Sequence, residues 1–86
     1  MSDPYSLIIL PAAQRQIKKL DATTRKRVAK KIDALKKAPR PPGVKKLTDS
    51  PDRYRVRAGD YRIIYKIQDK MLLITVVEVG HRSNIY

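Results

Sequence analysis

The chain has 86 residues, which is enough for one domain with a single small core, and we expect one unit over residues 1–86. Twenty Lys and Arg against eight Asp and Glu leave a net charge of +12, which favours a polyanion or an acidic protein as partner. The absence of cysteine and the single histidine exclude thiol chemistry and a structural zinc site, so we expect no metal and no cofactor. No apolar run approaches the ~20 residues of a membrane span, which predicts a cytoplasmic protein.

The first half of the chain predicts a strand followed by two helices. Residues 5–10 contain the run Leu-Ile-Ile-Leu, which is apolar enough to lie inside a sheet. Pro11 suits the first position of a helix, and Asp21 is a suitable N-cap for a second helix from Ala22 to about Lys37. Each helix carries an apolar stripe, formed by Ala13, Ile17 and Leu20 and by Val28, Ile32 and Leu35. We therefore expect an α-hairpin laid on a sheet.

The second half predicts an antiparallel meander. Closely spaced prolines end the second helix, and residues 44–47 form a short extended piece. Two runs of alternating polarity in residues 54–65 meet at Gly59-Asp60, which is typical of a β-hairpin. A polar turn at 68–70 leads to residues 71–79, a strand apolar on both faces that suits the centre of a sheet. The prediction is an α+β fold with both helices on one face of a four-stranded sheet.

Alternation in the hairpin separates apolar and basic side chains. Tyr54 and Val56 share one face, while Arg55 and Arg57 point to the other, where Arg62 joins them from the second strand. Such a basic face is either a solvated outer surface or an anion site. The candidates on that side are Arg55, Arg57, Arg62, Arg82 and Tyr86, with Lys45, Lys46 and His81 nearby in sequence.

These residues point to chemistry on a phosphate. The chain has no convincing carboxylate pair, no nucleophile with a base at a motif spacing and no Gly-rich phosphate loop. RNA carries its own nucleophile, the 2′-hydroxyl, which attacks the adjacent phosphate and expels the 5′-oxygen. An enzyme for that step needs cations on the transition state and an aligned substrate, which a stacked aromatic ring supplies. Basic faces more often only bind, so a non-catalytic RNA-binding module stays an alternative.

Motifs from Val44 onward resemble the RelE branch of the RelE/ParE toxin superfamily of bacterial toxin–antitoxin modules. The matching residues are Lys46-Leu47, Pro51-Asp52, Tyr54-Arg-Val-Arg, Gly59-Asp-Tyr-Arg-Ile-Ile-Tyr65, Val77 to Arg82, and Tyr86. The resemblance implies a RelE/ParE-like, microbial-RNase-like fold. It also implies a ribosome-dependent mRNA endonuclease that cuts the codon in the A site and so inhibits translation.

The resemblance also implies roles for single residues. Arg62 corresponds to the arginine that stabilises transition-state charge, Arg82 to the one acting on the leaving oxygen, and Tyr86 to the tyrosine stacked on the mRNA base. Arg55 and Arg57 stand where the best-known relatives carry lysines, one of them the proposed general base. A guanidinium keeps its proton at neutral pH, so Arg57 is catalytic only if its role is electrostatic. His81 is the one side chain suited to proton transfer near neutral pH, and its role stays open between catalysis and RNA binding.

Partners follow from the same resemblance. They are an acidic RelB-like antitoxin, the ribosomal A site and its mRNA, and no membrane. The toxin–antitoxin complex is expected to be hetero-oligomeric and to bind its operator through the antitoxin. The sister ParE branch shares the fold but poisons DNA gyrase, and it remains an alternative.

Overall fold

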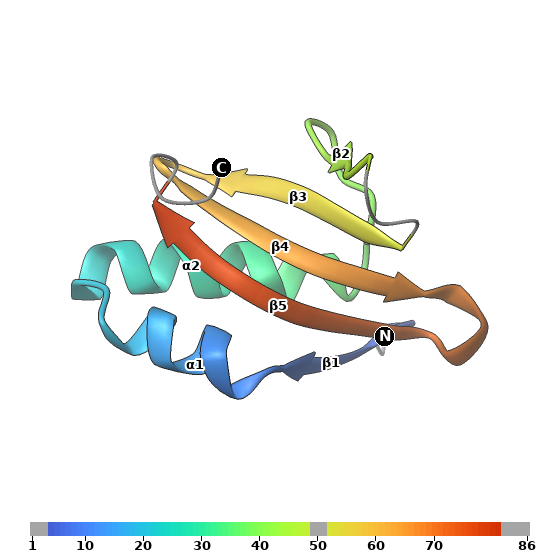
Figure 1. Ribbon diagram of the computed structural model, residues 1–86, viewed down its shortest axis with the longest axis horizontal. Helices are drawn as coiled ribbons and strands as arrows, with labels where there is room; N and C mark the ends of the chain where they lie inside the picture. Colours follow the sequence, from blue (N-terminus) through green and yellow to red (C-terminus); the bar gives the residue numbers. More distant parts are fainter. Residues whose placement is uncertain (1–3, 49–51, 82–86) are drawn as a thin grey trace.

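The computed structural model, which describes residues 4–48 and 52–81, contains a five-stranded sheet with two helices packed on one side (Figure 1). The strand order is β1-β5-β4-β3-β2, with β1 parallel to β5 and all other neighbours antiparallel. The elements are β1 (Ser6–Ile9), α1 (Pro11–Lys18), α2 (Ala22–Leu35), β2 (Lys45–Lys46), β3 (Arg53–Ala58), β4 (Tyr61–Gln68), the short 3-10 helix η1 (Asp69–Met71) and β5 (Leu73–His81).

The α+β prediction is confirmed, with two corrections to the sheet. The sheet has five strands instead of four, because Lys45 and Lys46 pair with Arg55 and Tyr54 at the edge of β3. A strand this short carries no alternation, so its pairing depends on the partner edge. The prediction that residues 5–10 lie inside the sheet is wrong, since β1 is an edge strand. Only alternate β1 side chains pack on the core, and Ile8 on the other face is 48% exposed.

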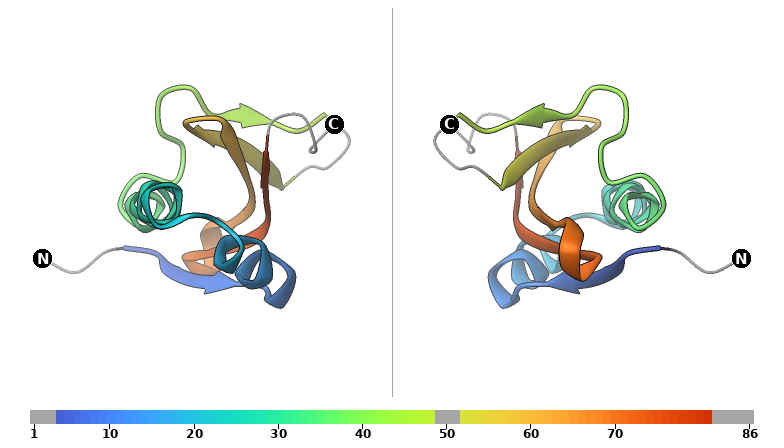
Figure 2. Two further views of the ribbon diagram at one scale, coloured as in Figure 1. Left: turned by 90° about the vertical axis from the view of Figure 1, so that its left-hand side faces the viewer. Right: turned by 90° about the vertical axis from the view of Figure 1, so that its right-hand side faces the viewer.

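The α-hairpin forms as predicted, although α2 ends at Leu35. The Asp21 carboxylate caps α2 by accepting from the Thr24 N–H at 3.3 Å, and Val28, Ile32 and Leu35 are buried. End-on views show both helices on one side of the twisted sheet (Figure 2). No helix in the described part of the chain is long and apolar enough to span a membrane.

The β3–β4 hairpin turns at Gly59-Asp60, as predicted. Val56 pairs with Ile63 and Tyr54 with Tyr65, which places these side chains on the helix-covered face. Gly59 opens the turn with φ 63, a left-handed conformation that glycine adopts without strain. A Cβ on Gly59 would also lie 2.9 Å from the Arg27 Nη1 atom, so the turn packs closely on α2.

An ion pair joins the proline-rich linker after α2 to η1, the short helix between β4 and β5. The Arg40 guanidinium donates to both carboxylate oxygens of Asp69, at 3.3 and 2.9 Å, and lies 5.2 Å from the centre of the Tyr54 ring. Tyr65 donates its hydroxyl hydrogen bond to the Pro39 carbonyl at 2.7 Å, and burial raises the pKa of this tyrosine. The linker that carries Gly43 and leads into β2 is therefore anchored at its start.

Replacing Arg40 with alanine should make the free energy of unfolding depend less on pH in the acid range. Hydrogen bonds from Arg40, and then from Tyr5, hold the pKa of Asp69 below its ordinary value. A depressed carboxyl pKa stabilises the fold above the unfolded-state pKa of about 4, and that stabilisation is lost as pH falls through the lower folded pKa. Wild type should thus be more stable than Arg40→Ala at pH 7. The difference between the two proteins in the free energy of unfolding should be smaller at pH 3.

Urea unfolding of both proteins at the two pH values measures this gap. Contributions from other carboxylates cancel in the comparison between the two proteins. The contact of Arg40 with the partly buried Tyr54 ring does not depend on the charge of Asp69, so the difference in stability should become smaller without vanishing. A gap of equal size at pH 7 and pH 3 would contradict the role assigned to the Arg40–Asp69 pair.

Candidate functional site

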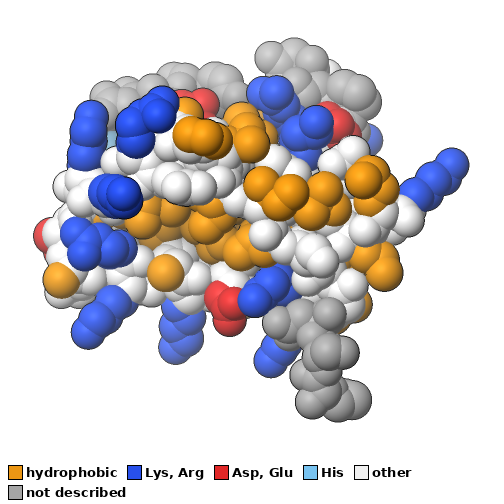
Figure 3. Space-filling view, turned by 90° about the horizontal axis from the view of Figure 1, so that it is seen from below, with side chains coloured by type: hydrophobic (Ala, Val, Ile, Leu, Met, Phe, Trp, Pro, Cys, Tyr) orange, Lys and Arg blue, Asp and Glu red, His pale blue; other side chains and the backbone are white. Residues whose placement is uncertain are grey.

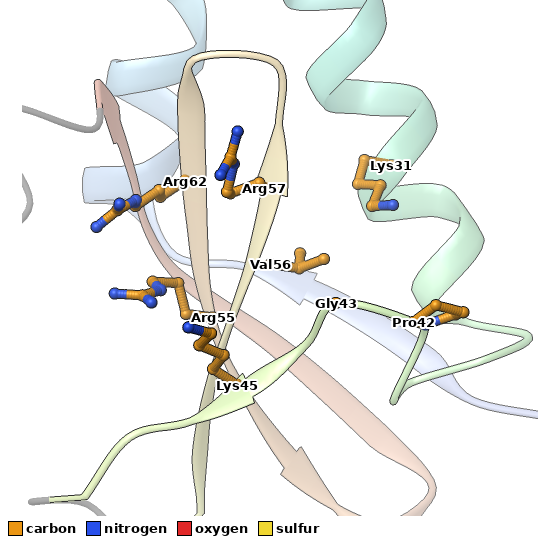
Figure 4. Close-up of a pocket in the computed structure, with 8 residues that line it drawn as sticks. All are labelled: Lys31, Pro42, Gly43, Lys45, Arg55, Val56, Arg57 and Arg62. Atoms are coloured by element: carbon orange, nitrogen blue, oxygen red, sulfur yellow. The ribbon is translucent and has the colours of Figure 1, made fainter.

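Three of the four arginines in the β3–β4 hairpin, Arg55, Arg57 and Arg62, gather on the sheet face that the helices leave uncovered. Arg57 pairs with Arg62 across the hairpin, and Arg55 pairs with Ile64 in the next row. Lys45 of β2 pairs with Arg55 on the other side of β3 and extends that row. Figure 4 shows Lys45, Arg55 and Arg62 together along the hairpin, with Arg57 toward the turn. The structure thus brings together four of the residues predicted for the site.

These side chains border a hollow of about 370 Å³. It is lined by Lys31, Pro42, Gly43, Lys45, Arg55, Val56, Arg57 and Arg62. Five of these eight residues are cationic, and the described lining contains no Asp or Glu. Positive charge concentrated in a concave surface raises the local potential for an anion. We refer to this cavity as the basic hollow.

Arg62 has the strongest signature of a binding group. Its Nε atom is buried and has no hydrogen-bond partner among the described residues. A buried polar atom without a partner is destabilising, and native structures retain few of them outside functional sites. A guanidinium in this state is suited to a phosphate, whose oxygens accept the parallel N–H bonds of its planar fork.

The sheet face also carries an apolar side chain that the alternation did not predict to be covered. Ile64 lies in the same row as Arg55 and Glu78, yet only 2% of it is exposed. Ile64 is therefore a buried apolar side chain among the basic residues of this face.

Two predicted residues lie elsewhere. Lys46 pairs with Tyr54 and His81 pairs with Tyr61, so both belong to rows on the opposite face from Arg62. The His81 ring packs edge-on against Tyr61, with 5.4 Å between ring centres. The structure does not bring either residue into the basic hollow, and it gives no support to His81 as the base at that position.

Arg82 and Tyr86 lie outside the described residues, so their predicted roles remain proposals. Lys31 of α2, by contrast, lines the basic hollow although the sequence did not single it out. It follows Val28 by three residues and so lies beside the buried stripe of α2, on the side that faces β3 (Figure 4). The spacing from Val28 indicates that Lys31 lies beside the buried stripe. It does not indicate which strand Lys31 faces, because that depends on how α2 packs against β3.

Basic side chains also spread beyond the hollow. Seen from below, Lys and Arg side chains project from the helical part of the surface and far outnumber Asp and Glu on that face (Figure 3). Exposed cations of this kind steer polyanions without specifying a sequence. The basic hollow is distinguished from this general field by its concavity and by the buried Arg62 Nε atom.

Comparisons with known proteins agree with the fold and the arrangement of the sheet. A sequence model of the family described as "ParE toxin of type II toxin-antitoxin system, parDE" matches residues 7–86. The mRNA interferase toxin RelE of Escherichia coli K12 is 32% identical over 86 residues, covering 95% of this chain and 90% of that protein.

Solved structures give the same result. The RelE–RelB complex of the archaeon Pyrococcus horikoshii OT3 contains a chain that superposes with a TM-score of 0.83 at 28% identity, covering 94% of this chain and 98% of that one. Isolated E. coli RelE superposes with a TM-score of 0.77 at 29% identity, covering 90% of this chain and 83% of that one. The protein therefore belongs to the RelE/ParE family of type II toxins, as a RelE-type member.

Proposed function

We propose that this chain is the toxin of a type II toxin–antitoxin module and acts as a ribosome-dependent mRNA endonuclease. The observation that carries the proposal is the buried Arg62 Nε atom, without a described partner, in a hollow lined by cations. The name mRNA interferase, borne by a relative that is 32% identical over nearly the whole chain, supports the same activity. The protein would act in the cytoplasm, where mRNA is translated.

The reaction is a transesterification within the RNA. The 2′-oxygen forms a bond to the adjacent phosphorus, the bond from phosphorus to the 5′-oxygen breaks, and a 2′,3′-cyclic phosphate remains. The proton lost by the 2′-hydroxyl is balanced by one gained at the 5′-oxygen. Arg62 stabilises the additional negative charge on the non-bridging oxygens, and Arg57 in the paired position adds to that field.

The arginines that line the hollow supply charge stabilisation rather than a base, because a guanidinium does not accept a proton at neutral pH. Arg57 therefore acts electrostatically in this mechanism. By resemblance, Arg82 acts on the leaving oxygen, and Tyr86 stacks on the base and aligns the attacking 2′-hydroxyl. The ribosome holds the codon in place.

The partner is an acidic RelB-like antitoxin. RelE chains were solved together with RelB, as in the Pyrococcus horikoshii complex, and a net charge of +12 favours an acidic partner. The antitoxin would cover the basic face in a hetero-oligomeric complex and supply the operator-binding surface.

A ParE-like gyrase poison is the second candidate, because the matching family model carries the ParE description. A third candidate is an RNA-binding module without catalysis. The test is primer extension on mRNA held in translating ribosomes, with antitoxin-free protein, beside a gyrase supercoiling assay. We expect cuts within the A-site codon that disappear with Arg82→Ala. Intact mRNA with inhibited supercoiling would transfer the protein to the ParE-like function. Intact mRNA with ribosome binding would leave only the RNA-binding module.

A further inference from the structure

The basic hollow extends well beyond the group that Arg62 can contact. Besides the hairpin it includes Lys31 from α2, and Pro42 and Gly43 from the linker. Figure 4 shows Lys31 on the helix side and the arginines on the hairpin side of this space. Its volume of about 370 Å³ is far larger than one phosphate group and lies in the range of small-ligand pockets. The space therefore has room for a nucleotide unit next to the one that is cut.

The cations of the hollow form no ion pair with another described residue. The ion pairs among the described residues join Lys36 to Asp33, Arg40 to Asp69 and Lys66 to Asp52. None of these pairs involves a cation that lines the hollow. Several like charges around one cavity repel one another, and a bound anion relieves that repulsion.

Two of these cations reach the hollow from elements other than the hairpin. Lys31 belongs to α2 and is half-buried, and Lys45 belongs to β2 and is exposed. Pro42 and Val56 are the apolar side chains that line the hollow. A cavity lined mainly by cations, with a few apolar side chains beside them, suits a nucleotide, which has a phosphate and an uncharged sugar and base.

We propose that the basic hollow is a subsite for the nucleotide that flanks the cleaved bond, with Lys31 as a ligand of its phosphate. This inference rests on the proposed function, because it assigns Arg62 to the phosphate that is cut. Lys31 is then a substrate-positioning residue. Binding a neighbouring phosphate restricts the RNA backbone and so helps to place the 2′-oxygen in line with the bond that breaks.

The test combines a protein variant with a modified substrate. Lys31→Gln removes the charge, and Lys26→Gln is the matched control, since Lys26 is exposed on the same helix and does not line the hollow. The substrates are ribosome-bound mRNAs in which a single phosphate flanking the cleaved one is replaced by an uncharged methylphosphonate. Cleavage is measured as kcat/KM by primer extension.

We expect Lys31→Gln to lower kcat/KM about tenfold on ordinary mRNA, whereas Lys26→Gln stays within about twofold of wild type. Wild type should lose a similar factor at one flanking methylphosphonate. Lys31→Gln should lose nothing further on that substrate, since the contact is already absent. Lys31→Arg should restore most of the activity, because it restores the positive charge.

Three results would overturn the proposal. One is equal activity of Lys31→Gln and Lys26→Gln on ordinary mRNA. Another is that, at every flanking position, the methylphosphonate lowers kcat/KM of Lys31→Gln by the same factor as it lowers kcat/KM of wild type. A loss of folding that Lys31→Arg does not rescue would make Lys31 merely structural. Failure of the proposed function looks different, because wild type would then leave ordinary mRNA intact on the ribosome.

Discussion

Replacing Arg62 with alanine is expected to slow mRNA cleavage on the ribosome by about 10²- to 10³-fold, the usual cost of removing a preorganised group that stabilises transition-state charge. The structure places Arg62 in the basic hollow beside Arg57, with its Nε atom buried and without a partner among the described residues. Binding to the ribosome should change much less, because many exposed cations contribute to it. Single-turnover primer extension and ribosome pelleting measure the two quantities separately.

The same substitution should not destabilise the fold. Arg62→Ala removes a buried polar atom without a partner and one of several like charges, so the free energy of unfolding should stay unchanged or rise by about 0.5–2 kcal/mol. Urea unfolding checks this, and Arg15→Ala on the exposed side of α1 is the control for loss of one positive charge. Equal losses of cleavage and ribosome affinity in Arg62→Ala would indicate a binding protein without catalysis.

An mRNA with a 2′-deoxy sugar at the attacking position should resist cleavage completely within the limits of detection. The proposed reaction takes its nucleophile from the substrate, and the described lining of the hollow offers no side chain that could replace it. Ribosomes programmed with this mRNA should bind the protein as tightly as ribosomes with ordinary mRNA. The readout is primer extension across the A-site codon.

The control is an mRNA with the 2′-deoxy sugar two codons away, which should be cut at the ordinary rate in the A site. Cleavage of the first substrate at a normal rate would exclude attack by the 2′-oxygen. Activation of water by the protein or the ribosome would then have to be considered in its place.

The hairpin shows how far local patterns reach in this protein. Alternation separated Val56 and Tyr65 from Arg55, Arg57 and Arg62, and the structure confirms both sides. Alternation of side chains predicts the two faces of the hairpin because one face packs against helices while the other does not. It failed at Ile64, which is 2% exposed although it lies in one row with Arg55 and Glu78.

The sequence predicted which segments form strands better than it predicted which strands pair. The run in β1 was apolar enough for the interior of a sheet, yet β1 occupies an edge and exposes Ile8. Lys45 and Lys46 have no strand pattern at all, and they pair only because β3 offers an edge beside them. Both outcomes depend on contacts between segments far apart in the chain, which periodicity does not describe.

The sequence alone determined the fold class, the two helices, the hairpin and the face on which the arginines stand, because helix caps, turns and alternation are local properties. Which cations share one cavity depends on how distant segments pack together. The tertiary structure brought Lys31 of α2 beside the hairpin and placed His81 and Lys46 on the opposite face from Arg62. Proximity in sequence does not place residues in one site, because neighbouring residues of a strand point to opposite faces. A cation from a helix far away in the sequence can lie closer to the site.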